Sequence, residues 1–114
     1  MHELSVVTAL VEQIQEVLAR EKACQLVSIT VAMGALSGVD RDAFEFCFPL
    51  VVEGTPLHGA QLHIEEVPLR LHCRDCGAES QPDEVFLIQC MTCGSGLVEI
   101  VDGRDLVLRS LEVK

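Results

Sequence analysis

The chain has 114 residues, and its 18 Asp and Glu outnumber its 8 Lys and Arg, so the formal net charge is −10. There is no Trp or Tyr and there are only four Phe, which argues against nucleic acid as the main partner, since that binding uses clustered cations and stacking rings. The longest apolar stretch, 46–52, is far shorter than the roughly 20 residues that cross a bilayer. The first residues also lack the basic and apolar segments of a secretory signal, so we expect a cytoplasmic protein with no membrane partner.

Apolar spacing in the first half of the chain predicts helices and strands in alternation. Apolar residues recur at intervals of three and four from Leu4 to Leu18, which predicts a helix over most of 3–21. Segments 26–33 and 62–67 have the alternating or β-branched pattern of strands. A second helix is expected to start at Asp40 as its N-cap.

The second helix contains Pro49, which removes a backbone hydrogen bond and crowds the preceding turn. The helix is therefore expected either to kink at Pro49 or to stop near Phe48. Near the end of the chain, 97–101 and 105–113 are predicted as strands on either side of Asp102-Gly103, a common hairpin turn. The apolar phase changes within 106–113, which indicates a bulge.

These elements predict an α+β fold with two helices packed on a small three-stranded sheet and an inserted four-cysteine zinc-ribbon module. We expect residues 1–67 and 105–114 to form the α+β domain, with the last strand returning to it. Residues 68–104 are expected to form the ribbon domain, which is short enough to need a metal for stability.

Four of the six cysteines form two Cys-x-x-Cys-Gly repeats, at Cys73 and Cys76 and at Cys90 and Cys93. Two-residue spacing lets both sulfurs of a pair face one ion, and four thiolates fill a tetrahedral Zn²⁺ site, so a structural zinc is favoured. An iron centre of the rubredoxin kind, disulfides and a redox-active pair are the alternatives. The other two cysteines, Cys24 and Cys47, are expected to be buried small residues.

A zinc-deaminase pattern is imitated by His63-Ile-Glu65 followed by the first cysteine pair. The spacing to Cys73 is too short, and the second cysteine pair would close the metal site to water. No nucleophile lies next to a base, so no enzymatic activity and no catalytic residue are expected. His63 is expected to be solvated, whereas His72, beside Cys73, could support the metal ligands.

The amino terminus, Met1-His2-Glu3, has a second metal-binding pattern. An α-amine, the first backbone nitrogens and the His2 imidazole can form a planar chelate that suits Ni(II) or Cu(II). The alternative is a frayed terminus with a solvated histidine. Glu3 and Asp40 can be explained by helix starts alone, but if the two helix starts lie together, Asp40 could supply an oxygen ligand or accept the His2 ring N–H.

Several segments of the chain resemble the HypA/HybF family of nickel-incorporation accessory proteins for [NiFe]-hydrogenase. They are the Met-His-Glu-Leu-Ser start, Met33-Gly-Ala-Leu-Ser-Gly-Val39, Ala43-Phe-x-Phe-x-Phe48, Gly59-x-x-Leu-x-Ile-Glu65, the two cysteine pairs and Ser110-Leu-Glu-Val113. The resemblance covers essentially the whole chain. The sequence departs from the family pattern at Pro49, where a polar helical residue is commoner.

The resemblance implies a nickel metallochaperone that delivers Ni(II) for hydrogenase maturation. His2, with Met1 and the nearby backbone nitrogens, would bind Ni(II), while Glu3 and Asp40 match positions linked to the nickel neighbourhood. The four paired cysteines would hold a structural zinc that couples to the nickel half. The implied partners are a nickel-maturation GTPase and the hydrogenase large subunit. Some members of the family also deliver nickel for urease maturation.

A different kind of function stays open, that of a zinc-ribbon adaptor that binds proteins and has no second metal site. It predicts no Ni(II) binding beyond that of a peptide with one histidine. Apolar surface on so small a body is compatible with a homodimer or with a partner-bound state, and the sequence does not choose between them.

Overall fold

The computed structural model describes residues 3–22, 25–82 and 87–114. The chain divides into two compact units. The first unit comprises Met1–Val31, Val39–Ile64 and Val107–Lys114, and the second comprises Ala32–Gly38 and Glu65–Leu106. Within the described ranges, no helix has both the length and the apolar character needed to span a membrane.

Helix α1 (Glu3–Glu21) confirms the helix predicted over 3–21. Its apolar stripe faces the core of the first unit, and the buried residues of that stripe are Val7, Leu10, Val11, Ile14 and Leu18. Leu4, predicted to belong to the same stripe, is instead exposed. Burial of the stripe supplies most of the stability of such a helix, because helical propensity alone is marginal in water.

Helix α2 (Arg41–Val52) begins where the sequence predicts, with Asp40 as its N-cap. Asp40 Oδ1 accepts hydrogen bonds from the backbone N–H of Asp42 at 3.0 Å and of Ala43 at 3.5 Å. These N–H groups have no partner inside the helix, so the cap both starts α2 and fixes the Asp40 side chain.

Helix α2 continues through Pro49 to Val52, so of the two expected courses, a kink at Pro49 or a stop near Phe48, the stop does not occur. Phe44, Phe48 and Val52 recur every four residues and are all buried, so they anchor the last turns to the core. The rings of Phe44 and Phe48 stack with centroids 6.4 Å apart. This packing offsets the one backbone hydrogen bond that proline cannot donate.

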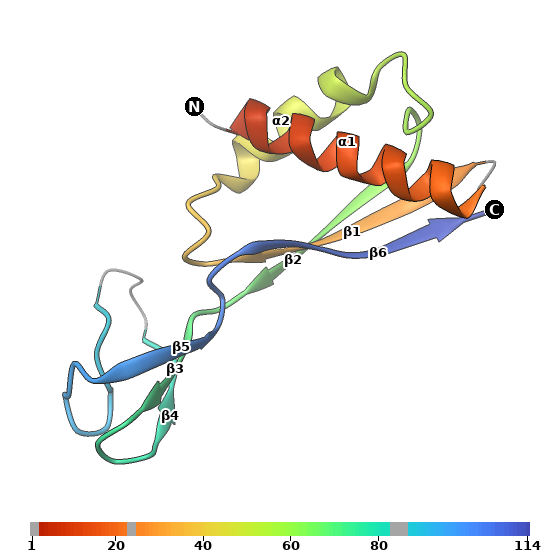
Figure 1. Cartoon of the computed structure of the whole chain (residues 1–114). Helices are drawn as coiled ribbons and strands as arrows, with labels where there is room; N and C mark the ends of the chain where they lie inside the picture. Colours follow the sequence, from red (N-terminus) through yellow and green to blue (C-terminus); the bar gives the residue numbers. More distant parts are fainter. Residues whose placement is uncertain (1–2, 23–24, 83–86) are drawn as a thin grey trace. The chain divides into compact units, whose positions relative to one another are not determined.

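The first sheet has three strands, β1 (Leu26–Gly34), β2 (Gln61–Val67) and β6 (Leu106–Val113), in the order β2-β1-β6. Helices α1 and α2 pack against each other, and both lie over one side of the β1 strand (Figure 1). The central strand β1 is the most buried, with Ile29 and Val31 fully inaccessible. The last strand thus returns to the first one, as predicted.

The second sheet consists of β3 (Arg70–Cys73), β4 (Glu79–Ser80) and β5 (Val98–Asp102), in the order β4-β3-β5. Both pairings are antiparallel. The short strands β3 and β4 were not predicted. The observed elements, two helices with small sheets and a four-cysteine module, confirm the predicted fold class.

The hairpin predicted across Asp102-Gly103 is wrong, because β5 pairs with β3 whereas β6 pairs with β1. The turn takes the chain from one sheet to the other. Gly103 has φ 86°, and a Cβ there would lie 2.4 Å from the backbone oxygen of Pro68. The turn therefore packs closely against the segment before β3, an approach that leaves no room for a side chain at Gly103.

The loop after β1 is tied to the same turn by backbone contacts within the second unit. Gly34 N–H donates to the carbonyl of Asp105 at 3.0 Å, and Leu36 N–H donates to the carbonyl of Gly103 at 2.8 Å. A Cβ on Gly34 would lie 2.5 Å from the Gly103 backbone. Two glycines therefore allow two backbone segments to approach closely.

Of the two cysteines outside the pairs, Cys47 lies on α2 and is partly exposed, so its predicted burial is wrong. The buried face of α2 is occupied by phenylalanines at neighbouring positions, which turns Cys47 toward the edge of the helix. Cys24 lies outside the described residues.

Candidate metal centres

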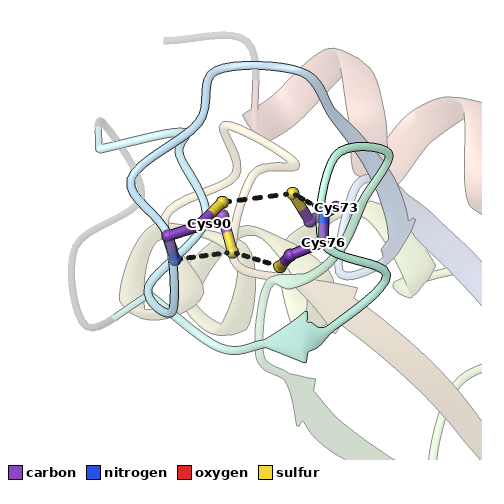
Figure 2. Close-up of side chains that lie close together, drawn as sticks. Cys73, Cys76 and Cys90 are labelled. Carbon is purple, nitrogen blue, oxygen red and sulfur yellow. Dashed lines mark hydrogen bonds between the residues drawn. The ribbon is translucent and has the colours of Figure 1, made fainter.

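The four paired cysteines meet in the second unit at the ends of two loops (Figure 2). We call Cys73–Gly77 the first knuckle and Cys90–Gly94 the second knuckle. All four Sγ atoms lie within 4.8 Å of one another. Across the knuckles, the Sγ atoms of Cys73 and Cys93 are 3.6 Å apart, as are those of Cys76 and Cys90.

Each knuckle is closed by the glycine that follows its cysteine pair. Gly77 and Gly94 have φ of 76° and 79°, a region that glycine enters without strain. Gly77 N–H donates to the carbonyl of Cys73 at 2.9 Å, and Gly94 N–H donates to that of Cys90 at 2.8 Å. The two loops thus fold alike and present their sulfurs to a common point.

Backbone N–H groups stabilise some of the thiolates but not all. The N–H groups of Cys93 and Thr92 lower the pKa of Cys90 to about 6. The N–H of Ser95 lowers the pKa of Cys93, but the thiol of Cys73 and loss of solvent outweigh it and raise that pKa to about 12. Four thiolates this close repel one another, so a bound cation is needed to keep all four deprotonated.

The donor set fits Zn²⁺, because four soft thiolates complete a tetrahedral site and leave no position for water. All four cysteines have free thiols, which does not favour the disulfide alternative. Among the described residues, no histidine or carboxylate lies close enough to the four cysteines to share a metal ion with them. The deaminase pattern, which needs a histidine ligand, is therefore not assembled, although a rubredoxin-type iron would use the same thiolates.

The two histidines near the cysteines lie outside the cluster. His63 is exposed on β2, as expected. His72 is partly buried on β3 and lies in register with Glu79 of β4 and Glu99 of β5. Its direct cross-strand neighbours are therefore carboxylates.

The starts of α1 and α2 lie together in the first unit. Asp40 N–H donates to Oε2 of Glu3 at 3.0 Å, and Glu3 is only 6% exposed. The positively charged chain terminus and then the Asp40 N–H lower the pKa of Glu3 to about 2. The two helix starts therefore lie together, which was the condition for Asp40 to approach the proposed amino-terminal chelate. Met1 and His2 themselves lie outside the described residues.

A four-thiolate ribbon joined to an α+β body defines a small metal-binding protein. Residues 1–113 match the family model described as hydrogenase/urease nickel incorporation, metallochaperone, hypA. The chain belongs to this family of nickel metallochaperones, which are maturation factors and not enzymes.

Relatives match the chain over nearly its whole length. It is 42% identical to the hydrogenase maturation factor HypA of Synechococcus elongatus over 113 residues, covering 99% of both chains. It is 36% identical to that of Nitrosospira multiformis, covering 99% of this chain and 97% of the relative. The solution structure of the Ni metallochaperone HypA from Helicobacter pylori superposes with a TM-score of 0.71 at 29% identity, covering 99% of this chain and 97% of that one.

A second solution structure, of a HypA protein, superposes with a TM-score of 0.74 at 30% identity. It covers 100% of this chain and 97% of its own. The similarity in sequence and in fold therefore extends over both units of the chain.

Proposed function

We propose that this chain carries Ni(II) at its amino terminus and delivers it for maturation of [NiFe]-hydrogenase. The ligands would be the Met1 amine, the adjoining backbone nitrogens and the His2 imidazole. These donors close adjoining chelate rings in a plane, a geometry that Ni(II) accepts and tetrahedral Zn²⁺ does not. An exposed terminal chelate also suits a carrier, which must release its ion to a partner.

The observation that carries the proposal is the hydrogen bond from Asp40 N–H to Glu3, the residue next to His2. It holds the start of α2 beside the start of α1. Both cap bonds of Asp40 end on Oδ1, so its other carboxylate oxygen is the one we assign to the nickel neighbourhood.

The negative charge at the starts of α1 and α2 also suits the binding of a cation there. Helix starts carry a positive partial charge, so a divalent cation beside two of them needs compensating negative charge. Glu3, Asp40 and Asp42 supply it. We assign Glu3 to holding Asp40 in place, because its Oε2 already accepts the Asp40 N–H.

The four cysteines of the knuckles would hold one structural Zn²⁺. The ion would supply no reaction step, since thiolates fill every coordination position, and it would keep the ribbon folded. The net charge of −10 suits a carrier that handles cations and docks on basic surfaces. The partners we propose are a nickel-maturation GTPase and the hydrogenase large subunit, in the cytoplasm.

The test is metal content by mass spectrometry followed by Ni(II) titration of the wild type and His2→Ala. We expect one zinc per chain in both proteins and tight Ni(II) binding by the wild type alone. Equal Ni(II) binding by both would contradict the assignment of His2 and favour a zinc-ribbon adaptor. A chain without zinc would contradict the ribbon assignment separately.

A further inference from the structure

Besides the contacts between sulfurs, a side-chain hydrogen bond links the first knuckle to Ser95, the residue that follows the second knuckle. The hydroxyl of Ser95 donates to Oδ2 of Asp75 at 2.5 Å. Asp75 lies between Cys73 and Cys76, whereas Ser95 follows Cys93 by two positions. We call this pair the Asp75–Ser95 latch.

Ser95 also contacts both cysteines of its own knuckle. Its carbonyl accepts the N–H of Cys90 at 2.8 Å, and its N–H bonds to the sulfur of Cys93. Its hydroxyl oxygen accepts the N–H of Leu97 at 3.0 Å. A shift of Asp75 relative to Ser95 would therefore move the sulfurs of the second knuckle relative to the first.

The two knuckles are nearly symmetric, but the Asp75–Ser95 bond has no counterpart at the corresponding residues. Ala78 follows the first knuckle as Ser95 follows the second, and it makes the same backbone contacts with the cysteines of the first knuckle. Alanine has no hydroxyl, and the counterpart of Asp75 is Thr92. The latch therefore lies on one side of the cysteine cluster, and Ala78 cannot form the same bond on the other side.

We propose that the Asp75–Ser95 latch makes the ribbon site selective for Zn²⁺ against the Ni(II) that the chain carries. The inference rests on the proposed function. Thiolates bind both ions, and selectivity between such ions comes from geometry more than from affinity. A nickel carrier that exchanged its structural ion for its cargo would lose both the ribbon and the cargo.

The sulfur positions give the physical reason. A tetrahedral site with metal–sulfur bonds of about 2.3 Å places its sulfurs ~3.8 Å apart, close to the 3.6 Å of two cross-knuckle pairs, Cys73 with Cys93 and Cys76 with Cys90. Square-planar Ni(II) requires two of the six sulfur separations to open to about 4.6 Å, twice that bond length. Such opening turns one knuckle against the other, and the latch opposes that movement.

The experiment challenges zinc-loaded full-length protein with Ni(II) in excess of the amino-terminal site. Released zinc is followed with a chromogenic chelator, and nickel entry with thiolate charge-transfer absorption. We expect the wild type to exchange slowly and Asp75→Ala and Ser95→Ala to exchange on the order of 10-fold faster. Ser95→Thr keeps the hydroxyl and should stay slow, and the double variant should exchange no faster than either single variant.

Thr92→Ala is the matched control, because Thr92 is the counterpart of Asp75, and its backbone N–H, which alanine keeps, donates to the sulfur of Cys90 in the same knuckle. It should exchange like the wild type. Asp75→Asn keeps an acceptor for Ser95, so it should load zinc and exchange at a rate between those of the wild type and Asp75→Ala.

Exchange at the wild-type rate in the Asp75 and Ser95 variants would overturn the proposal. Multiplying effects in the double variant would also overturn it, since two independent residues form no latch. A wild type that contains no zinc would instead refute the ribbon assignment in the proposed function, and it would be detected before any nickel is added.

Discussion

Asp40 combines two properties in one side chain, a helix cap and a negative charge. The cap needs only an oxygen that accepts the N–H groups of Asp42 and Ala43, which asparagine also provides. A nickel neighbour needs the charge as well. Substitutions that keep one property and remove the other therefore separate the structural role from the proposed one.

For Asp40→Asn we expect nearly unchanged stability but weaker Ni(II) binding. For Asp40→Ala we expect the same loss of affinity together with about 1 kcal/mol less stability, because the cap is also lost. Denaturant unfolding of the nickel-free proteins and Ni(II) titration measure the two effects. Unchanged Ni(II) affinity in Asp40→Asn would leave Asp40 as a cap alone.

The phenylalanines of α2 give a test of the core. Phe44 is fully buried and stacks on Phe48, whereas Phe46, two positions away on the same helix, is 72% exposed. Phe44→Ala should lower the free energy of unfolding by about 3–5 kcal/mol, and Phe46→Ala by no more than about 0.5 kcal/mol. Equal losses in the two variants, measured by chemical denaturation, would contradict the assignment of the buried face.

Among the elements, local sequence signals predicted well wherever the structure depends on local chemistry. The apolar stripe of α1 apart from Leu4, the Asp40 cap and the alternation of Leu62 and Ile64 in β2 fall where the pattern places them. The prediction failed where distant segments decide. The path of the chain after Asp102 depends on the backbone near Pro68, and the course of α2 past Pro49 depends on core packing.

The close approach of Gly34 and Gly103 is a contact of this long-range kind. Gly34→Ala should destabilise the second unit by about 1–3 kcal/mol, because the new Cβ would lie 2.5 Å from the Gly103 backbone. Gly96→Ala is the matched control, since no atom lies within 4 Å of a Cβ there and its φ is not positive. Thermal unfolding should separate the two variants, and equal melting temperatures would refute the close contact.

For the whole molecule, the sequence indicated both metal-binding patterns but not how their surroundings are built. The cysteine spacing predicted the cluster that the four sulfurs form. No sequence pattern pointed to the bond between Asp75 and Ser95, because it joins two loops far apart in the chain. That the two helix starts lie together was considered only as a condition, and the hydrogen bond from Asp40 to Glu3 was not predicted, since it depends on how α1 and α2 pack.

The two units should respond differently to removal of zinc. Large apolar side chains that are fully buried in the described part of the second unit are few, chiefly Leu69 and Leu71, so its fold should depend on the metal. The first unit has its own core around α1 and α2. A strong chelator should therefore abolish the dispersed amide NMR signals of the ribbon while the helical circular dichroism is largely kept. Cooperative loss of both signals would contradict this independence.

The central claim is that Ni(II) binds at the amino terminus, and lengthening the chain by one residue before Met1 tests it most directly. The extra residue leaves every side chain in place but moves the α-amine away from the His2 imidazole. Isothermal titration with Ni(II) should show tight binding to the native chain and loss of that binding in the extended one, with one zinc per chain in both. Equal affinity in the two proteins would place the nickel elsewhere and contradict the account.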